Sequence, residues 1–188
     1  MKSPWTIPPG TQRVFIGIPV NHQFQQHVNL LLKPIKDSRQ DIRWVLEKNR
    51  HLTLAFLGNR PKAEVESLLG LFDETYRGET HFQYRFSKLT RFPGSAGRII
   101  ALTGEPGLQL DHLFQLTRQL LQKNDFEFER KTFRPHVTLG RIRRAKQVKI
   151  IIDQPINITL DISKIRLFKS TLTESGSVYS ALKEVHLG

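Results

Sequence analysis

The chain contains no cysteine. This absence excludes disulfide bonds, a thiolate nucleophile and the thiolate ligands of most structural zinc sites. The 188 residues also include no apolar run near the roughly 20 residues that a membrane span requires. The first residues lack the continuous apolar segment of a secretory signal, so we expect a cytoplasmic protein without a membrane anchor.

Acidic residues are scarce relative to basic ones. The sequence has 17 Asp and Glu against 29 Lys and Arg, a formal net charge of +12. Such an excess predicts a polyanionic partner, because Lys and Arg near phosphates release condensed counterions. The alternative is a basic surface that serves only solubility. The length suits a monomeric single domain over residues 13–188, preceded by a flexible, proline-rich arm over residues 1–12.

Hydrophobic periodicity predicts alternating strands and helices. Helical spacing indicates helices after Asn21, from Pro61, and over residues 108–123, and Pro34 should end or distort the last turn of the first. Apolar, aromatic and β-branched runs predict strands at residues 13–20, 51–57, 81–92, 98–104 and 136–142, then within 155–172 and 178–187 around a turn at 174–177.

The tetrapeptide His-x-Thr-Leu occurs twice, at residues 51–54 and 136–139. The residue frequencies give roughly 0.06 copies by chance, so two copies indicate a real duplication. The offset of 85 residues also relates the strand beginning at Arg13 to the one beginning at Arg98. A strand-helix-strand unit written twice predicts an α+β fold of two similar lobes about a pseudo-twofold axis, with equivalent sites facing each other.

Each motif presents one imidazole and one hydroxyl. Side chains two apart on a strand share a face, so His51 projects with Thr53, and His136 with Thr138. Imidazoles titrate near pH 6.5, which allows two of them to divide acid and base roles at neutral pH. The threonine hydroxyls are donors for phosphoryl oxygens. Together these residues suit an in-line displacement at phosphorus.

Other chemistries fit the sequence less well. Zinc sites collect three or four His, Cys or carboxylate ligands, whereas each motif here supplies one histidine and a threonine, with no Asp or Glu close by. We therefore expect no metal. No glycine-rich phosphate loop or nucleophile elbow is present, which argues against a kinase or an acyl hydrolase.

Arg141 is the candidate cation for a phosphate. Strict alternation places it opposite His136, so it reaches the site only if the strand bulges at Gly140 or ends there. The alternative is that Arg141 is only one more residue of the basic run Arg141, Arg143, Arg144 and Lys146. Phe133 and Arg134 flank the second motif. They either contact a nucleotide or serve only core packing and solvent contact. The remaining histidines are predicted to lie on the surface or its boundary: His22, His27, His81, His112 and His186.

These motifs and their surroundings resemble the two-histidine phosphoesterase superfamily, and within it the RNA 2′,3′-cyclic phosphodiesterases, also called 2′-5′ RNA ligases. The similarity runs from about Arg13 to the end of the chain. It is carried by RVFIGIPV, IRWVLEKNRHLTLAFLG, SKLTRFPGSAGRIIALTG, FRPHVTLGRIRR and IRLFKSTLTESGSVYSALKEVHL.

The resemblance implies a bilobal fold whose antiparallel sheets line a central groove, with helices outside and no metal or nucleotide cofactor. It implies His51 and His136 as the catalytic pair, and Thr53, Thr138 and Arg141 as phosphate ligands. The implied reaction opens the 2′,3′-cyclic phosphate at an RNA end to a 2′-phosphomonoester. Reversible joining of tRNA halves through a 2′-5′ bond is implied as a weaker activity.

The resulting hypothesis gives His136 the role of general base on water and His51 that of general acid on the 3′ oxygen. The two roles remain exchangeable, because pseudo-symmetry makes the imidazoles alike. Two other functions stay open. One is an RNA-end binding module without turnover. The other is a phosphodiesterase of small cyclic-phosphate nucleotides or 2′-5′ oligonucleotides, for which the basic surface would be incidental.

Overall fold

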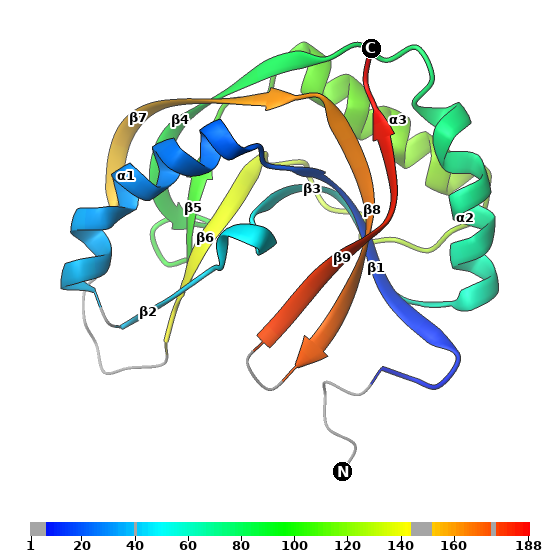
Figure 1. Cartoon of the computed structure of the whole chain (residues 1–188), viewed down its shortest axis with the longest axis horizontal. Helices are drawn as coiled ribbons and strands as arrows, with labels where there is room; N and C mark the ends of the chain where they lie inside the picture. The colour runs from blue at the N-terminus through cyan, green and yellow to red at the C-terminus, as the bar shows by residue number, and fades with distance from the viewer. Residues whose placement is uncertain (1–6, 40, 144–151, 174–175) are drawn as a thin grey trace.

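The computed structural model describes residues 7–39, 41–143, 152–173 and 176–188. The elements follow one another as β1 (Thr11–Pro19), α1 (His22–Ser38), β2 (Ile42–Trp44), a short 3-10 turn η1 (Glu47–Asn49), β3 (His51–Pro61), α2 (Lys62–Thr75), β4 (Phe82–Phe92), β5 (Ile99–Thr103), α3 (Leu108–Lys123), β6 (His136–Ile142), β7 (Asp153–Ile162), β8 (Lys164–Thr173) and β9 (Gly176–His186) (Figure 1).

The strands form one antiparallel sheet in the order β7-β4-β5-β6-β3-β1-β8-β9, and β2 pairs with β6 beside this path. At the centre, β3 and β6 are joined through the single residue pair Leu52 and Val137. These two residues are themselves 85 positions apart, so the pseudo-twofold axis passes through their pair. The predicted α+β class and its two halves are confirmed, and the two expected sheets are continuous at this pair.

The duplicated unit is present as β1-α1-β3 and β5-α3-β6, but its helices are exchanged between the halves. Helix α1 packs against β7, and its Phe24 ring lies 5.5 Å from that of Phe86 on β4. Helix α3 packs against β3 and against α2, and its Thr117 hydroxyl is hydrogen-bonded at 2.8 Å to that of Tyr76, the residue that follows α2. Figure 1 shows α1 over the β4–β7 half, and α2 and α3 over the β1–β8 half. Each repeat therefore covers the other's strands.

Helix α1 begins as predicted, because the Asn21 side chain accepts a hydrogen bond from the Phe24 N–H at 2.8 Å. It does not end at Pro34 but continues to Ser38. Pro34 removes the helical donor of the Leu30 carbonyl group, and both Pro34 and Leu30 lie on the exposed side of the helix. The Ser38 hydroxyl donates to the carbonyls of Pro34 and Ile35 and closes the last turn.

Three other boundaries differ from the sequence prediction. Thr11 and Gln12, assigned to the arm, already pair with Pro61 and Arg60 in β1. The arm prediction for residues 1–6 lies outside the described residues. The stretch 155–172 divides at Ser163 into β7 and β8, and the short strand β2 was not predicted. None of the described helices is both long and apolar enough to span a bilayer.

Candidate active site

The four motif side chains gather around the central Leu52 and Val137 pair. In antiparallel pairing, the neighbours of such a pair lie opposite one another on the other face of the sheet. His51 therefore lies beside Thr138, and Thr53 beside His136. All four are partly exposed, whereas Leu52 and Val137 are fully buried on the opposite face. The structure thus places both copies of the motif in one site.

Both imidazoles are oriented by main-chain carbonyl groups at equivalent positions. His51 Nδ1 donates to the carbonyl oxygen of Asn49 at 2.8 Å, and His136 Nδ1 donates to that of Arg134 at 2.8 Å. A carbonyl oxygen only accepts, so Nδ1 carries the hydrogen in each ring. Each Nε2 is left to give or take a proton.

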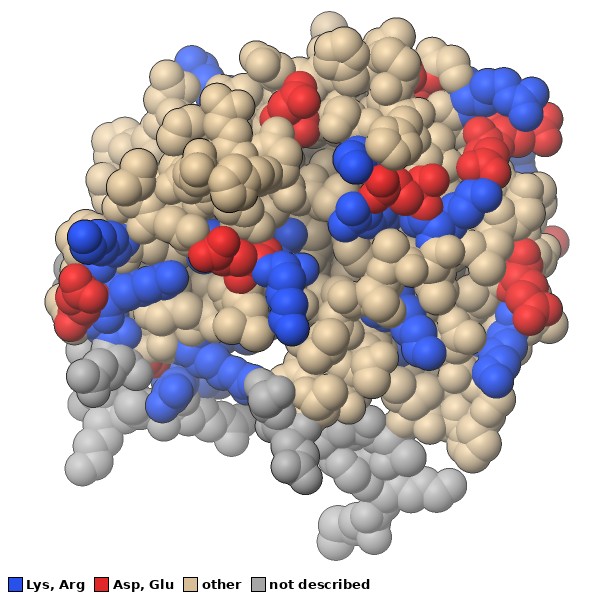
Figure 2. Space-filling view, viewed as in Figure 1, with Lys and Arg blue, Asp and Glu red and all other residues tan. Residues whose placement is uncertain are grey.

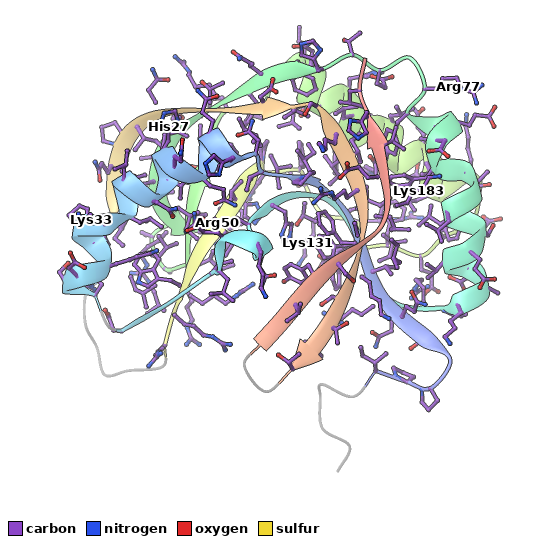
Figure 3. All side chains as sticks on the ribbon, in the orientation of Figure 1. His27, Lys33, Arg50, Arg77, Lys131 and Lys183 are labelled. Carbon is purple, nitrogen blue, oxygen red and sulfur yellow. The ribbon has the colours of Figure 1, made fainter. Side chains whose placement is uncertain are left out.

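The turn before His51 is held by a polar network beneath α1. The buried guanidinium of Arg50 donates through Nη1 to Gln25 Oε1 at 2.7 Å and to Asn29 Oδ1 at 2.9 Å. Figure 3 shows Arg50 between α1 and η1. Burial lowers the pKa of Arg50. Because Asn49 immediately precedes this anchored residue, the carbonyl that orients His51 is fixed relative to α1.

Aromatic rings surround the two imidazoles unequally. The His51 ring lies 4.6 Å from that of Phe15, 5.7 Å from Phe168 and 5.1 Å from Tyr179. The ring of Phe92 is stacked on His136 at 4.1 Å. Three aromatic rings therefore surround His51 whereas one is stacked on His136, and His51 remains only partly exposed to water.

This environment lowers the pKa of both histidines. Burial is the main cause for His51, with smaller contributions from the positive charges of His136 and Arg141, and lowers its pKa to about 4. Burial and the Arg141 charge also lower the pKa of His136. The hydrogen bonds to Asn49 and Arg134 act in the opposite direction in each case. Both imidazoles are neutral in the free protein at pH 7.

A bulge in β6 brings Arg141 to the site face. Gly140 pairs with Ile100 of β5, but Thr138 pairs with Ala101, so Leu139 is the extra residue. The inserted residue shifts the alternation by one, and Arg141 returns to the face of Thr138. The bulge lies one residue before the position suggested by the sequence. Gly140 instead permits a close approach, because a Cβ there would lie 2.6 Å from Ile42 Cγ2.

The first half has a bulge at the equivalent position. Ile16 pairs with Ala55 and Gly17 with Thr53, so that Leu54 is the extra residue of β3. The residue that corresponds to Arg141 is Phe56, since the two are 85 positions apart. Its ring is covered by the guanidinium of Arg13 at 4.7 Å. The backbone of the site is pseudo-symmetric, but its charge is not.

The other candidates divide into packing and surface roles. The Phe133 ring is stacked on Phe114 at 4.2 Å, which is a packing role, and Arg134 is exposed and contributes its carbonyl group. No sequence pattern singled out the aromatic residues around the imidazoles, because they come from β1, β4, β8 and β9. The prediction that the remaining histidines are on the surface is confirmed for His22, His27, His81, His112 and His186.

Within the part of the chain that the structure describes, no three His, Cys, Asp or Glu side chains are close enough together to hold a metal ion. The site instead offers imidazole nitrogens, hydroxyl groups and one guanidinium group. These groups serve proton transfer and the stabilisation of negative charge on phosphoryl oxygens.

Comparison with known proteins places this site in a family context. Residues 18–101 and 100–179 each match the family described as LigT like Phosphoesterase, one match for each half of the chain. An RNA 2′,3′-cyclic phosphodiesterase of Thermotoga maritima is 30% identical over 92% of this chain and 94% of its own length. A protein of the same name from Aquifex aeolicus is 26% identical over 94% and 97%.

Solved structures share the fold. A Thermus thermophilus protein superimposes with a TM-score of 0.81 at 23% identity, covering 93% of this chain and 97% of its own. The apo form of Escherichia coli LigT gives a TM-score of 0.73 at 24% identity, with coverage of 95% and 98%. The family suggested by the two His-x-Thr motifs is thus confirmed: the chain belongs to the LigT-like phosphoesterases of the two-histidine superfamily, and it is an enzyme of that class.

Proposed function

We propose that this enzyme hydrolyses the 2′,3′-cyclic phosphate at an RNA end to a 2′-phosphomonoester, without metal or cofactor, by two-histidine acid-base catalysis. One observation carries the proposal. Two imidazoles, each with Nδ1 bound to a carbonyl oxygen and Nε2 unoccupied, lie on one sheet face with two threonine hydroxyls. The names of the relatives from Thermotoga maritima and Aquifex aeolicus support the substrate class.

The reaction proceeds as an in-line displacement. His136 Nε2 takes a proton from water, the water oxygen attacks phosphorus, and the bond from phosphorus to O3′ breaks. His51 gives its proton to O3′, so the phosphate remains on O2′. Thr53, Thr138 and Arg141 hold the non-bridging oxygens, on which negative charge accumulates.

The acid role of His51 requires that the complex carry one proton on the imidazole pair. Its pKa of about 4 leaves the ring neutral in the free protein at pH 7. A bound cyclic phosphate is an anion next to both rings, and a nearby negative charge favours the imidazolium form. The opposite assignment, with His51 as base and His136 as acid, has the same proton count and is distinguished by the substrate experiment given in the Discussion.

The lowered pKa values predict an acidic activity optimum. Catalysis needs one neutral and one protonated imidazole, and with both pKa values below 6.5 the free enzyme loses its remaining proton as the pH rises towards neutrality. We expect kcat/KM for 2′,3′-cyclic CMP to follow a bell-shaped profile, with an acid limb near pH 4 and an alkaline limb below pH 6.5. Rates measured at constant ionic strength test this. An alkaline limb at pH 7 or above would contradict it.

The same site also suits a reversible ligation as a weaker activity, in which another hydroxyl replaces water as the nucleophile. Attack by a 5′-hydroxyl of a second RNA in place of water would join the two pieces, such as tRNA halves, through a 2′-5′ bond. We propose RNA with cyclic-phosphate ends as the partner, acted on by a monomer in the cytoplasm.

The function is tested by incubating enzyme and an RNA oligonucleotide that ends in a 2′,3′-cyclic phosphate in the presence of EDTA, and then determining the position of the product phosphate. We expect a 2′-phosphomonoester at an undiminished rate. A 3′ product would reject the assigned leaving group, and loss of activity in EDTA would reject metal-free catalysis. Binding without any product would instead indicate an RNA-end binding module.

A comparison of substrates addresses the remaining alternative. If cyclic mononucleotides or 2′-5′ oligonucleotides are turned over better than the RNA, the enzyme acts on small molecules and its basic surface is incidental.

A further inference from the structure

Three arginines share the site face where β2 and β6 meet, at the end of β6 away from His136. Arg141 lies on β6, Arg143 lies directly after it, and Arg43 lies on β2. All three are exposed. We refer to Arg43, Arg141 and Arg143 as the β6 arginine cluster. Figure 2 shows Lys and Arg side chains gathered at the lower edge of the half that carries β2.

The cluster continues the site face of the sheet outward. Arg43 and Arg141 are directly opposite each other in the β2 and β6 register, so their side chains leave the sheet on the same face. Arg143 follows Arg141 by two residues, just beyond β6, and its backbone N–H still bonds to the residue before β2, so it shares that face about 6.6 Å further along. Arg141 is close enough to influence the pKa of both catalytic histidines. The cluster therefore begins at the catalytic site and leads away from it.

The main chain holds the cluster in place. Ile142 N, between Arg141 and Arg143, donates to the Arg98 carbonyl at 2.8 Å. Arg98 itself is not part of the cluster, because it precedes Ile99, which is directly opposite Arg141, and its Nη2 donates to the Ile142 carbonyl at 3.2 Å. Arg143 N donates to the Asp41 carbonyl at 2.9 Å. The carboxylate of Asp41 is engaged by Arg39 at 3.1 Å. Asp41, the acidic residue immediately before β2, is thus already paired with an arginine outside the cluster.

The other half of the molecule provides an internal comparison. The positions equivalent to Arg141 and Arg143, 85 residues earlier, are Phe56 and Gly58. The guanidinium of Arg13 lies over the Phe56 ring. At these equivalent positions the pseudo-symmetric backbone therefore carries two arginines on the β6 side and none on the β3 side, while aromatic rings lie around His51.

We infer that the β6 arginine cluster binds the phosphates upstream of the reacting RNA end, and so selects a polynucleotide over a cyclic mononucleotide. Arg141 contacts the cyclic phosphate, and the arginines beyond it neutralise the next backbone phosphates as the strand leaves the site along β6. This inference rests on the proposed function for the identity of the substrate. The row of charges along one strand is the arrangement that a single-stranded phosphate backbone requires.

A salt titration of RNA binding tests the inference independently of catalysis. The probe is a fluorescent ten-nucleotide RNA that ends in a 3′-phosphate, and its Kd is measured by anisotropy from low to high salt. Each phosphate contact contributes about 0.7 to the slope of log K against log salt concentration for single strands. Replacing Arg43 and Arg143 together by glutamine (R43Q/R143Q) should reduce the slope by about 1.4.

A second double variant controls for net charge. Arg77 and Lys123 are exposed on the α2 and α3 side of the molecule, with Arg77 at its far end in Figure 3. R77Q/K123Q removes the same charge and should leave the slope within about 0.3 of the original enzyme. If both double variants change the slope equally, or if neither changes it, the inference is wrong.

Turnover of 2′,3′-cyclic CMP separates this inference from the proposed function. The mononucleotide has no upstream phosphate, so R43Q/R143Q should hydrolyse it within about twofold of the original rate while its kcat/KM for the cyclic-phosphate RNA falls about tenfold at low salt. An equal loss on both substrates would overturn the inference. If the original enzyme hydrolyses neither substrate, the proposed function fails, and the change in binding slope still decides whether the cluster binds RNA.

Discussion

Replacing His136 by alanine should lower kcat on a cyclic-phosphate RNA by about 10²- to 10⁴-fold, the contribution typical of a positioned acid or base. His51→Ala should cause a loss of the same order. Single-turnover assays at saturating RNA isolate the chemical step from binding. Both side chains lie at the partly exposed face of the sheet, so the fold should persist. Unchanged thermal unfolding of the variants controls for misfolding.

A modified substrate assigns the acid and the base. If sulfur replaces the bridging 3′ oxygen, the leaving group is a good one without protonation, so the general acid becomes dispensable. We expect the 3′-thio substrate to restore most of the activity of His51→Ala and none of that of His136→Ala. Rescue of His136→Ala instead would reverse the roles. Near-normal activity of both single variants on the unmodified RNA would reject two-histidine catalysis.

Replacing Arg141 by glutamine should lower kcat/KM by about 10²-fold, because one donor to a developing oxyanion contributes on the order of 10² to 10³. Lysine at this position should recover only part of the loss, since it lacks the planar pair of donors. The matched control is Arg85→Gln, at an exposed arginine on β4. That control should stay within twofold of the original activity.

The Arg141 variant also has a pH signature that a merely structural role would not produce. The positive charge of Arg141 lowers the pKa of His51 and of His136. Removing it should raise both values, so the acid and alkaline limbs of the kcat/KM profile move to higher pH. Loss of activity without such a shift would show that the guanidinium does not act on the imidazoles.

The central pair of histidines was predictable because it is encoded locally. His-x-Thr on a strand places two side chains on one face whatever the rest of the fold does, and the constant offset of 85 residues indicated that both copies belong to equivalent positions. A single antiparallel pair between Leu52 and Val137 then suffices to bring the two copies together.

Features that depend on partners distant in the sequence were not predictable. The apolar stripe of α1 shows that one face is buried, but not that Phe24 packs against Phe86 in the opposite half. The enclosure of His51 requires Phe168 and Tyr179 from β8 and β9, more than 100 residues away along the chain. Without that enclosure, no argument from sequence could place the pKa of His51 near 4.

The bulge in β6 was predictable in part: its presence could be inferred from the sequence, but its position could not. Gly140 indicated an irregularity, but the register with β5 shows that Leu139 is the extra residue, and the glycine is needed because Ile42 and Trp44 pack closely against it. The orientation of Arg141 therefore depends on the pairing of three strands, and alternation along β6 alone gave the opposite face.

We propose that the two halves of the repeat supply one acid and one base to the same reaction. The rate of the double variant H51A/H136A, compared with those of the two single variants, tests it most directly. Residues that act as a unit are not additive, so the double variant should be no slower than the slower single variant, within about threefold. A double variant slowed by the product of the two single effects would mean that the histidines act independently, and would contradict the account.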